Sequence, residues 1–401
     1  MKSCDIVING AGIPGLLLAL LLVREAGSAK PEILLLDRQQ PQADDSLHAQ
    51  PQTVQDFDLR VFAITEASRQ LFVRAGAWPQ ATQRIYPYQH MLVWDAGGKG
   101  SIHFDAAEIG VLALGYIAEG RVLHDLLVRQ LQQENSIEIL AGDELQQLEE
   151  DNDQLQLTLK SGNTVNARLL VGADGARSHV RQLAGIESVG WAYGQQAVVA
   201  TVATEHDHQS TAWQRFLPEG PLAFLPMQKP WCSIVWSVSE HRADELCQLD
   251  DEGFIRILTG DFAAHLGAVT AVGPRAKFPL RLSHARAYTA PRLALVADAA
   301  HTVHPLAGQG LNLGLHDVAS LAEQLLLAWQ AGKDIGSRRV LRAYERSRKG
   351  DNWMMQASFD GLKRLFSNDQ SLLTQLRNTG LTAVDRLPML KNAFVRKAMG
   401  L

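Results

Sequence analysis

Cysteine is scarce in this chain, with three among 401 residues, at Cys4, Cys232 and Cys247. No two of them have the CxxC spacing of a zinc site, and an odd number cannot pair completely within one chain. A disulfide framework and a cysteine-bound zinc are therefore excluded, and we expect a cytoplasmic protein in a reducing environment. His206 and His208 stand next to acidic residues, but a solvated loop explains them better than a ligand cluster, so no metal is expected.

The chain also lacks a hydrophobic run long enough to cross a membrane. The longest apolar run, residues 13–23, contains Pro14 and Gly15 and is closed by Arg24. It is too short for a membrane span, and the glycine motif around it explains it better than a secretory signal does. The net charge is −5, so no nucleic-acid partner is expected. The chain has no internal repeat and no low-complexity tract.

Positive charge is nevertheless concentrated at one end. Residues 333–401 hold 14 Lys and Arg against 6 Asp and Glu, a net charge of +8, which leaves −13 on the remainder. In this helical segment Met355, Phe359, Leu362 and Phe366 recur at helical spacing on one face. The basic surface can be a solvated helix face, or it can attract anionic lipid or an acidic partner.

The first 37 residues have the pattern of one βαβ unit. Buried-strand sequences at residues 5–9 and 33–37 flank a strong helix former at residues 16–24.

The turn of this unit has the spacing Gly10-Ala-Gly12-Ile-Pro-Gly15. Gly10 permits the tight turn, Gly12 lets a pyrophosphate approach the backbone, and Gly15 lets the helix pack closely on the sheet. The helix N-terminus offers free N–H groups to the phosphate. Asp37 stands 22 residues after Gly15, where a carboxylate can bind ribose hydroxyls, and Arg38 follows it. These residues predict a dinucleotide site but do not distinguish FAD from NAD.

A second glycine-rich segment makes that choice. A buried strand at residues 293–296 leads to Asp298, whose carboxylate can bind the hydroxyls of a ribityl chain. The next loop feeds glycines into a helix that starts near Leu311, and free N–H groups at residues 310–312 would face the N1–C2=O edge of a flavin. A nicotinamide enzyme has no need of this late element, so the cofactor is expected to be FAD. The candidate cofactor residues of the segment are Asp298, Pro305, Gly308, Gln309, Gly310, Leu311 and Asn312.

A third motif, residues 172–181, follows a predicted hairpin and precedes a helix. Asp174 is a candidate cofactor residue, with Arg177 or Arg181 offering charge to phosphate. Asp and Ser also cap helices well, so the motif has a structural alternative of equal weight.

Residues 191–282 are rich in β-formers and turns, and predict a second, mostly antiparallel sheet. Five tryptophans lie in or near this stretch, and most of them should be buried: Trp94, Trp191, Trp213, Trp231 and Trp236. The sequence thus predicts an α/β fold in three parts. These are a Rossmann-type FAD-binding domain (residues 1–80, 106–185 and 286–330), a substrate-binding β-sheet domain (81–105 and 186–285) and a helical C-terminal region (331–401).

The three motifs, in this order, resemble those of the flavoprotein aromatic hydroxylases related to p-hydroxybenzoate hydroxylase. The closer resemblance is to the ubiquinone-biosynthesis hydroxylases of the UbiH, UbiF and VisC group, and it covers nearly the whole chain. Its further carriers are the segments Asp58-Leu-Arg60, Gly115-Tyr-Ile-Ala-Glu119, Ala212-Trp-Gln214, Gly220-Pro221, Phe278-Pro279-Leu280 and Tyr344-Glu345-Arg346.

The resemblance implies an FAD-dependent monooxygenase that hydroxylates the ring of a polyprenylated phenol in ubiquinone biosynthesis. NADH or NADPH reduces the flavin, O2 adds to give a C4a-hydroperoxide, and the distal oxygen is transferred to the ring. His304 and Pro305 are the candidate catalytic residues, although the flavin carries the chemistry. The cofactor positions carried over from the family are Gly10, Gly12, Gly15 and Asp37 for the ADP part, Arg60 over the cofactor, Asp298 for the ribityl chain and residues 305–312 beside the isoalloxazine ring.

Two positions depart from the group's pattern. Ala297 stands where a Gly is usual before Asp298, and a methyl close to the cofactor path would cost affinity. Gly120 stands where an Asn is usual after Glu119, which puts a polar contact near the flavin in doubt.

Two other functions stay open: hydroxylation of a small soluble phenol, and a flavin-binding accessory role in the biosynthetic complex. A polyprenylated substrate is nearly insoluble in water. The resemblance therefore also implies peripheral contact with the inner membrane through the basic C-terminal region, or association with other ubiquinone-biosynthesis proteins.

Overall fold

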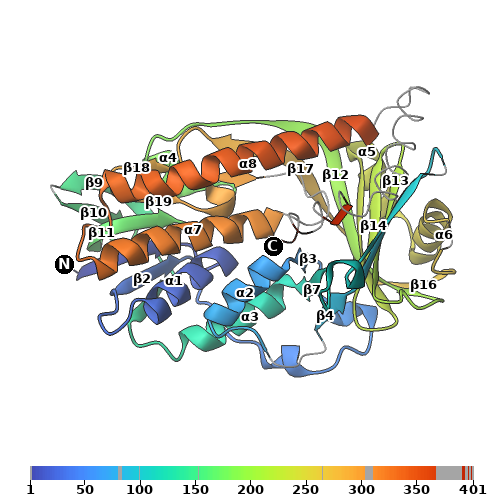
Figure 1. The fold of residues 1–401 in the computed structure, drawn as a ribbon, viewed down its shortest axis with the longest axis horizontal. Helices are drawn as coiled ribbons and strands as arrows, with labels where there is room; N and C mark the ends of the chain where they lie inside the picture. The colour runs from blue at the N-terminus through green and yellow to red at the C-terminus, as the bar shows by residue number, and fades with distance from the viewer. Residues whose placement is uncertain are drawn as a thin grey trace.

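The computed structural model describes residues 2–79, 84–98, 100–151, 153–263, 265–302 and 310–366, with 391, 392, 396 and 399. For residues 355–366 it describes the backbone alone, so the predicted apolar face from Met355 to Phe366 lies outside the described side chains. The fold is α/β, as the sequence predicts. Two large sheets stand at opposite ends of the molecule, and helices cover the first (Figure 1).

The first sheet has the strand order β18-β19-β11-β1-β2-β8, and β10 and β9 extend it beside β11. β1 pairs in parallel with both β11 and β2, which confirms the predicted βαβ unit, and β10 and β11 form the predicted hairpin. Its strands are β1 (Lys2–Asn9), β2 (Ile33–Asp37), β8 (Ile137–Ala141), β9 (Leu145–Asp151), β10 (Gln154–Leu159), β11 (Thr164–Gly172), β18 (Thr289–Ala290) and β19 (Leu293–Leu295).

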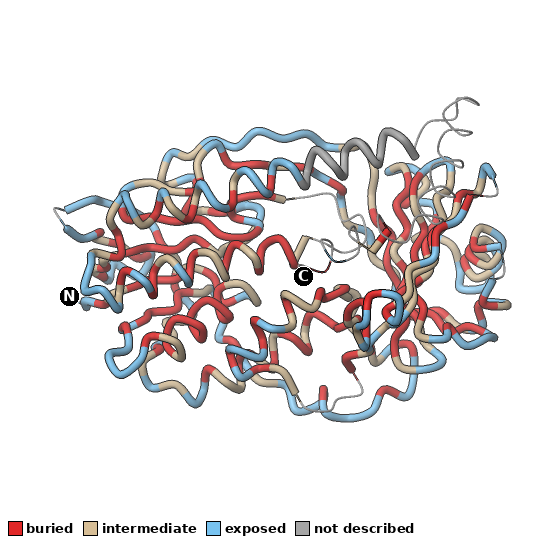
Figure 2. The backbone as a smooth tube through the Cα atoms, viewed as in Figure 1, coloured by how far each residue is buried: buried red, intermediate tan, exposed pale blue. Residues whose placement is uncertain are grey.

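Helix α1 (Ile13–Glu25) accounts for the long apolar run. It is buried along every residue from Gly15 to Val23, because it packs between the first sheet, α3 (Gly120–Leu131) and α7 (Gly310–Gln330). A helix that is covered all round needs no polar face. Figure 2 shows buried positions gathered in this layer.

The second sheet has the order β20-β17-β12-β15-β14-β13-β5-β6, with β16 beside β12. It is antiparallel except where β13 pairs with β5, as predicted. Two helices that the sequence pattern does not predict pack on this sheet, α5 (Glu240–Gln248) and α6 (Asp251–Asp261). The strands are β5 (His90–Asp95), β6 (Ser101–Asp105), β12 (Ser188–Thr204), β13 (Thr211–Leu217), β14 (Gly220–Pro226), β15 (Trp231–Ser239), β16 (Val269–Val272), β17 (Ala276–Ala285) and β20 (His301–Thr302).

Four of the five tryptophans lie in a buried apolar cluster or pack against one, as the sequence predicts. Trp236 is buried, Trp94, Trp213 and Trp231 are partly exposed, and Trp191 is exposed. The reason for Trp191 is local topology. β15 pairs with β12 from Gln195 onward, so the first part of β12 is an edge strand that pairs with β17 and forms an arm.

A small sheet, β3-β7-β4, lies between the two large ones (Figure 1). Its strands are β3 (Val61–Ile64), β7 (Gly115–Glu119) and β4 (Ile85–Tyr88). Helix α8 (Arg338–Phe366) packs along α7 and extends toward the second sheet (Figure 1). Among the described residues, no helix combines the length and the apolar character that a membrane span requires.

Candidate functional site

The glycine turn after β1 has room for a ligand at one position. Gly10 has a φ of +114°, and a Cβ there would lie 2.4 Å from the carbonyl oxygen of Ala173. A Cβ on Gly15 would lie 1.9 Å from the carbonyl oxygen of Gly10, so neither glycine can bear a side chain. At Gly12 the nearest neighbour of a Cβ would be Cδ of Pro14, 3.9 Å away. The open side of the turn therefore lies at the N-terminus of α1, where no side chain caps the N–H groups.

Asp37 lies beside this turn at the end of β2. Its Oδ2 accepts a hydrogen bond from the Ala11 N–H at 2.7 Å, and its Oδ1 accepts one from the Gln39 N–H at 2.9 Å. A carboxylate can accept more than two hydrogen bonds, so capacity remains for ribose hydroxyls. Arg38 instead contacts Glu144, with 3.3 Å between its Nη2 and the carboxylate, and its side chain is 71% exposed.

Asp298 stands in the loop between β19 and α7, as predicted. Its side chain is exposed to solvent, but protein surrounds it closely enough that desolvation raises the pKa of its carboxyl. The attraction of His301, and then of Arg60, lowers this pKa by a smaller amount. Arg60 is 238 residues away in sequence but close enough to act on this charge. An accessible carboxylate in desolvating surroundings, with an arginine nearby, suits the binding of a polar cofactor chain.

The backbone of Arg60 is fixed by the two sequence segments at residues 58–60 and 115–119. The Arg60 N–H donates to Oδ1 of Asp58 at 3.1 Å, and the Arg60 carbonyl accepts from the Gly120 N–H at 2.7 Å. The Asp58 N–H in turn donates to Oε2 of Glu119 at 2.7 Å. The guanidinium carbon of Arg60 lies 5.8 Å from the centre of the Phe278 ring on β17. Arg60 thus extends from the small sheet to the second sheet.

Glu119 is the buried anchor of this unit. Its Oε1 lies 2.8 Å from Nη1 of Arg84, and both side chains are buried. Gly120, next to it, departs from the family pattern for a steric reason. A Cβ there would lie 3.0 Å from the Phe62 ring and 3.3 Å from the Arg60 carbonyl oxygen. An Asn at this position would push these groups apart, so the glycine permits tighter packing around Arg60.

Ala297, the other departure, has a φ of +54°, in the left-handed region that favours glycine. Its side chain is buried, and its Cβ would come within 2.6 Å of a Cβ placed on Gly314 of α7. The methyl therefore packs against α7, and the cost that it carries in this structure is backbone strain.

Gly310 opens α7, one residue before the predicted start, and Leu311 is partly buried. The side chain of Asn312 is not free for a ligand. Its Nδ2 donates to the Ala63 carbonyl at 2.8 Å, and its Oδ1 accepts from the Thr65 N–H at 3.1 Å. Asn312 thus ties α7 to β3, and the cofactor contact predicted at residues 310–312 depends on their backbone N–H groups. The candidates outside the described residues are His304, Pro305, Gly308 and Gln309.

Asp174 caps the start of a helix, which is the structural role that the sequence left open for it. It accepts a hydrogen bond from Oγ of Ser178 at 2.6 Å and two more from backbone N–H groups of α4 (His179–Leu183). Arg181 is buried, and its Nη1 donates to the Ala299 carbonyl at 2.8 Å. The motif therefore stabilises the Asp298 loop through the contact between Arg181 and Ala299.

A buried polar network that the sequence analysis did not identify lies next to the same loop. It joins Asp317 of α7, His301, and Arg348 and Asn352 of α8, all buried. The sequence feature that could have revealed this network is the position of Asp317, a carboxylate on the apolar side of a helix between Leu315 and Val318.

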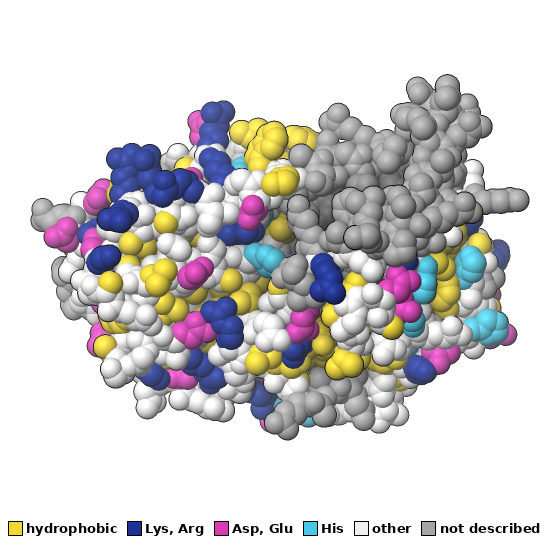
Figure 3. Space-filling view, in the orientation of Figure 1, with side chains coloured by type: hydrophobic (Ala, Val, Ile, Leu, Met, Phe, Trp, Pro, Cys, Tyr) yellow, Lys and Arg dark blue, Asp and Glu magenta, His cyan; other side chains and the backbone are white. Residues whose placement is uncertain are grey.

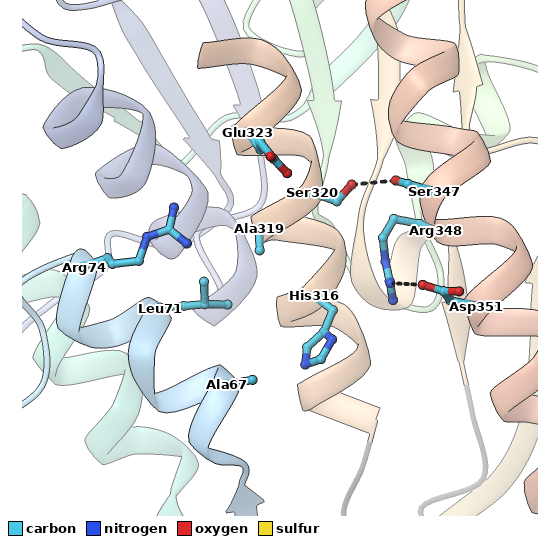
Figure 4. A pocket seen from close by; sticks show the side chains of 10 residues that line it. All are labelled: Ala67, Leu71, Arg74, His316, Ala319, Ser320, Glu323, Ser347, Arg348 and Asp351. Carbon is cyan, nitrogen blue, oxygen red and sulfur yellow. Dashed lines mark hydrogen bonds and ion pairs between the residues drawn. The ribbon is translucent and has the colours of Figure 1, made fainter. Parts of the chain in front are cut away.

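A cavity of about 520 Å³ lies on another side of α7, between α2 (Glu66–Arg74), α7 and α8 (Figure 4). Its lining includes Arg74, His316 and Glu323, and Arg348 and Asp351 face it from α8. The lining carries both positive and negative side chains. None of the predicted cofactor residues lines the cavity, so it is separate from the predicted FAD site.

Comparisons with known proteins agree with this geometry. Residues 3–357 match the family model described as an FAD binding domain. The chain is 39% identical to ubiquinone hydroxylase UbiL of Rhodospirillum rubrum, over 100% of this chain and 90% of that protein. It is 37% identical to 3-demethoxyubiquinol 3-hydroxylase of Escherichia coli, over 100% and 99%.

Among solved structures, p-nitrophenol 4-monooxygenase PnpA from Pseudomonas putida has a TM-score of 0.77 at 18% identity, over 100% of this chain and 97% of that one, which shows the shared fold. The open glycine turn, the Asp298 loop and the full-length similarity lead to one conclusion: the chain is an FAD-dependent enzyme that belongs to the FAD-binding-domain family and, within it, to the ubiquinone-biosynthesis hydroxylases.

Proposed function

We propose that this protein uses NADH or NADPH and O2 to hydroxylate the aromatic ring of a polyprenylated phenol, a precursor of ubiquinone. The observation that carries the proposal is the full-length similarity to two hydroxylases of ubiquinone or demethoxyubiquinol.

FAD, when bound, supplies the activation of O2 and the transfer of one oxygen atom. The protein's part is to hold and tune it. The N–H groups around Gly12 would hold the pyrophosphate, Asp37 the ribose, and Asp298 the ribityl hydroxyls. Backbone N–H groups at residues 310–312 would stabilise negative charge on the flavin edge, because a helix N-terminus carries positive partial charge.

Apolar side chains near Arg60 would receive the prenylated ring. A buried apolar cluster joins the small sheet to β14 and β15 and includes Phe57, Met227 and, at its edge, Trp231. The rings of Phe57 and Trp231 have centroids 5.1 Å apart. His304 and Pro305 stay the proposed substrate-side residues, and a histidine there would hold or accept the phenol proton.

The test uses the purified holoenzyme. We expect flavin absorbance, NAD(P)H oxidation stimulated by a short-chain prenylated phenol, and a product one oxygen atom heavier. A deletion strain should accumulate the unhydroxylated intermediate. Stimulation by small soluble phenols alone would favour hydroxylation of a small soluble phenol. Bound flavin that NAD(P)H does not reduce in the presence of any of these substrates would favour the accessory role.

The proposal includes peripheral, salt-sensitive association with the inner membrane or with other ubiquinone-biosynthesis proteins. Its support is the low solubility of such a substrate in water and the net charge of +8 on residues 333–401.

A further inference from the structure

The described half of α8 carries an exposed basic stripe. Arg338, Arg342 and Arg346 recur at four-residue spacing, and Arg339 stands beside them, so they share one side of the helix. All four are exposed, and none has an ion pair within the part of the chain that the structure describes.

The two acidic residues of α8 whose side chains the structure describes, Glu345 and Asp351, do not neutralise this stripe. Glu345 accepts a hydrogen bond from the Tyr288 N–H at 2.9 Å, and Asp351 lies 3.1 Å from Nη1 of the buried Arg348. These two carboxylates thus serve contacts within the protein and do not pair with the exposed arginines.

Large exposed apolar side chains adjoin the stripe on two elements. On α8, Trp353 is 65% and Met354 is 56% exposed, and on the arm of β12, Trp191 is 50% and Val189 is 52% exposed. Figure 3 shows hydrophobic side chains beside a group of Lys and Arg along this upper edge of the molecule. Single exposed apolar residues are ordinary, but a group of them next to unpaired arginines is not.

Two hydrogen bonds connect α8 to the start of β12. Nζ of Lys349 on α8 donates to the Arg286 carbonyl, and the Arg286 N–H donates to the Glu187 carbonyl, one residue before β12 begins. Figure 1 shows the start of β12 running along α8. We name the surface formed by Arg338, Arg339, Arg342, Arg346, Trp353 and Met354 of α8 with Val189 and Trp191 of β12 the α8–β12 surface.

We propose that the α8–β12 surface docks the enzyme on an anionic lipid bilayer. Exposed arginines that pair with no carboxylate among the described residues are attracted by anionic headgroups, and tryptophan places its amphipathic ring at the boundary between headgroups and acyl chains. An acidic protein would satisfy the arginines but would leave the tryptophans without a matching environment. The inference rests on the proposed function in one respect, that a polyprenylated substrate must be taken from a membrane.

The test is co-sedimentation of the holoenzyme with vesicles of phosphatidylcholine alone, or with phosphatidylglycerol added, at low and high salt. We expect binding only to the anionic vesicles, with loss at high salt. Arg342→Gln with Arg346→Gln should weaken the binding about tenfold or more, and Trp191→Ser with Trp353→Ser should weaken it at unchanged net charge.

The matched control is Lys229→Gln with Arg256→Gln. It removes the same charge from exposed positions of the second-sheet part, and it should bind vesicles as the unchanged protein does. Retained flavin absorbance and turnover of a water-soluble short-chain phenol show that each variant is folded.

Equal binding by the arginine variant and its control overturns the proposal, as does an absence of binding to anionic vesicles. Capture of an acidic protein through these arginines, without lipid binding, would also overturn it. If the enzyme turns over short-chain phenols but does not bind vesicles, the docking inference fails and the proposed function stands. If the enzyme binds vesicles but hydroxylates no phenol, the proposed function fails and the docking inference stands.

Discussion

His301 Nε2 lies 2.5 Å from Oδ2 of Asp317, with both side chains buried. The same oxygen accepts from the Ala297 N–H at 3.1 Å, while Oδ1 accepts from Nε of Arg348 at 2.9 Å and Nδ2 of Asn352 at 3.0 Å. Burial raises the pKa of Asp317, but the attraction and hydrogen bond of His301, with Arg348, outweigh it and hold the pKa below its ordinary value. One carboxylate thus fixes α7, α8 and both flanks of Asp298.

Asp317→Asn should lower the free energy of unfolding by about 3 kcal/mol, because it leaves the buried guanidinium of Arg348 without this charge partner. FAD affinity should fall as well, since the Asp298 loop loses its support. Asp351→Asn is the control. It removes the other, exposed carboxylate partner of Arg348 and should change stability by no more than about 1 kcal/mol. Urea denaturation and FAD titration of both variants would decide, and equal stability of the two would refute this role of Asp317.

The depressed pKa of Asp317 also gives a pH dependence. A carboxyl whose folded pKa is below its unfolded value contributes stability that is present above the unfolded pKa, about 3.9, and is lost as the pH falls through the folded pKa. We therefore expect the stability difference between the unchanged protein and Asp317→Asn to shrink below about pH 4. A difference that stays constant across this range in urea titrations would contradict the assignment.

Asp298→Ala should separate cofactor binding from apoprotein stability. Because desolvation raises the folded pKa of Asp298, the folded apoprotein loses stability as the pH rises from the unfolded pKa through the folded one. At neutral pH the variant lacks this penalty, so its apoprotein should unfold at no lower urea concentration than the unchanged one. FAD binding should weaken by about 1.5–3 kcal/mol through loss of a charged hydrogen-bond acceptor. An unchanged FAD dissociation constant together with unchanged turnover would remove Asp298 from the site.

Two glycines of the first turn should respond differently to substitution. Gly12→Val places its side chain in open space and should fold, yet it should retain little FAD because the pyrophosphate position is filled. Gly15→Ala should fail to fold, because its Cβ would lie 1.9 Å from the Gly10 carbonyl oxygen. Circular dichroism and the flavin content of the purified proteins measure both effects. Full flavin occupancy in a folded Gly12→Val would show that the pyrophosphate is bound elsewhere.

The sequence could predict those features whose cause lies within a short segment. The glycine turn, α1 and β2 depend on neighbours in sequence, and so does the strand that leads to Asp298. Helices α5 and α6 were missed, although Ser239 and Asp250 cap them locally, because the surrounding segments have the pattern of strands.

What the sequence could not predict depends on contacts between distant segments. Asp317, His301 and Arg348 meet through tertiary packing, and each residue alone reads as an ordinary polar position. The same is true of the side chain of Asn312, which binds the Ala63 carbonyl of β3, while the backbone N–H of Asn312 is the group predicted at the flavin. Trp191 is exposed because β15 does not reach the start of β12, which no local pattern encodes.

Ala297 of the Asp298 loop packs closely against Gly314 of α7. A Cβ on Gly314 would lie 2.6 Å from the Ala297 Cβ, so Gly314→Ala should destabilise the protein by about 1–3 kcal/mol through overpacking. Ala297→Gly alone should change stability by less than about 1 kcal/mol, because relief of the left-handed backbone offsets the greater entropy of glycine in the unfolded chain.

Removal of the Ala297 methyl takes away the closest clash, so Ala297→Gly with Gly314→Ala should recover at least half of the stability lost in Gly314→Ala alone. A coupling free energy of about 0.5 kcal/mol or more in the double-mutant cycle is the expected signature of direct contact. Strict additivity of the two single effects, measured by urea denaturation, would show that Ala297 and Gly314 do not pack against each other, and the steric account of Ala297 would then be wrong.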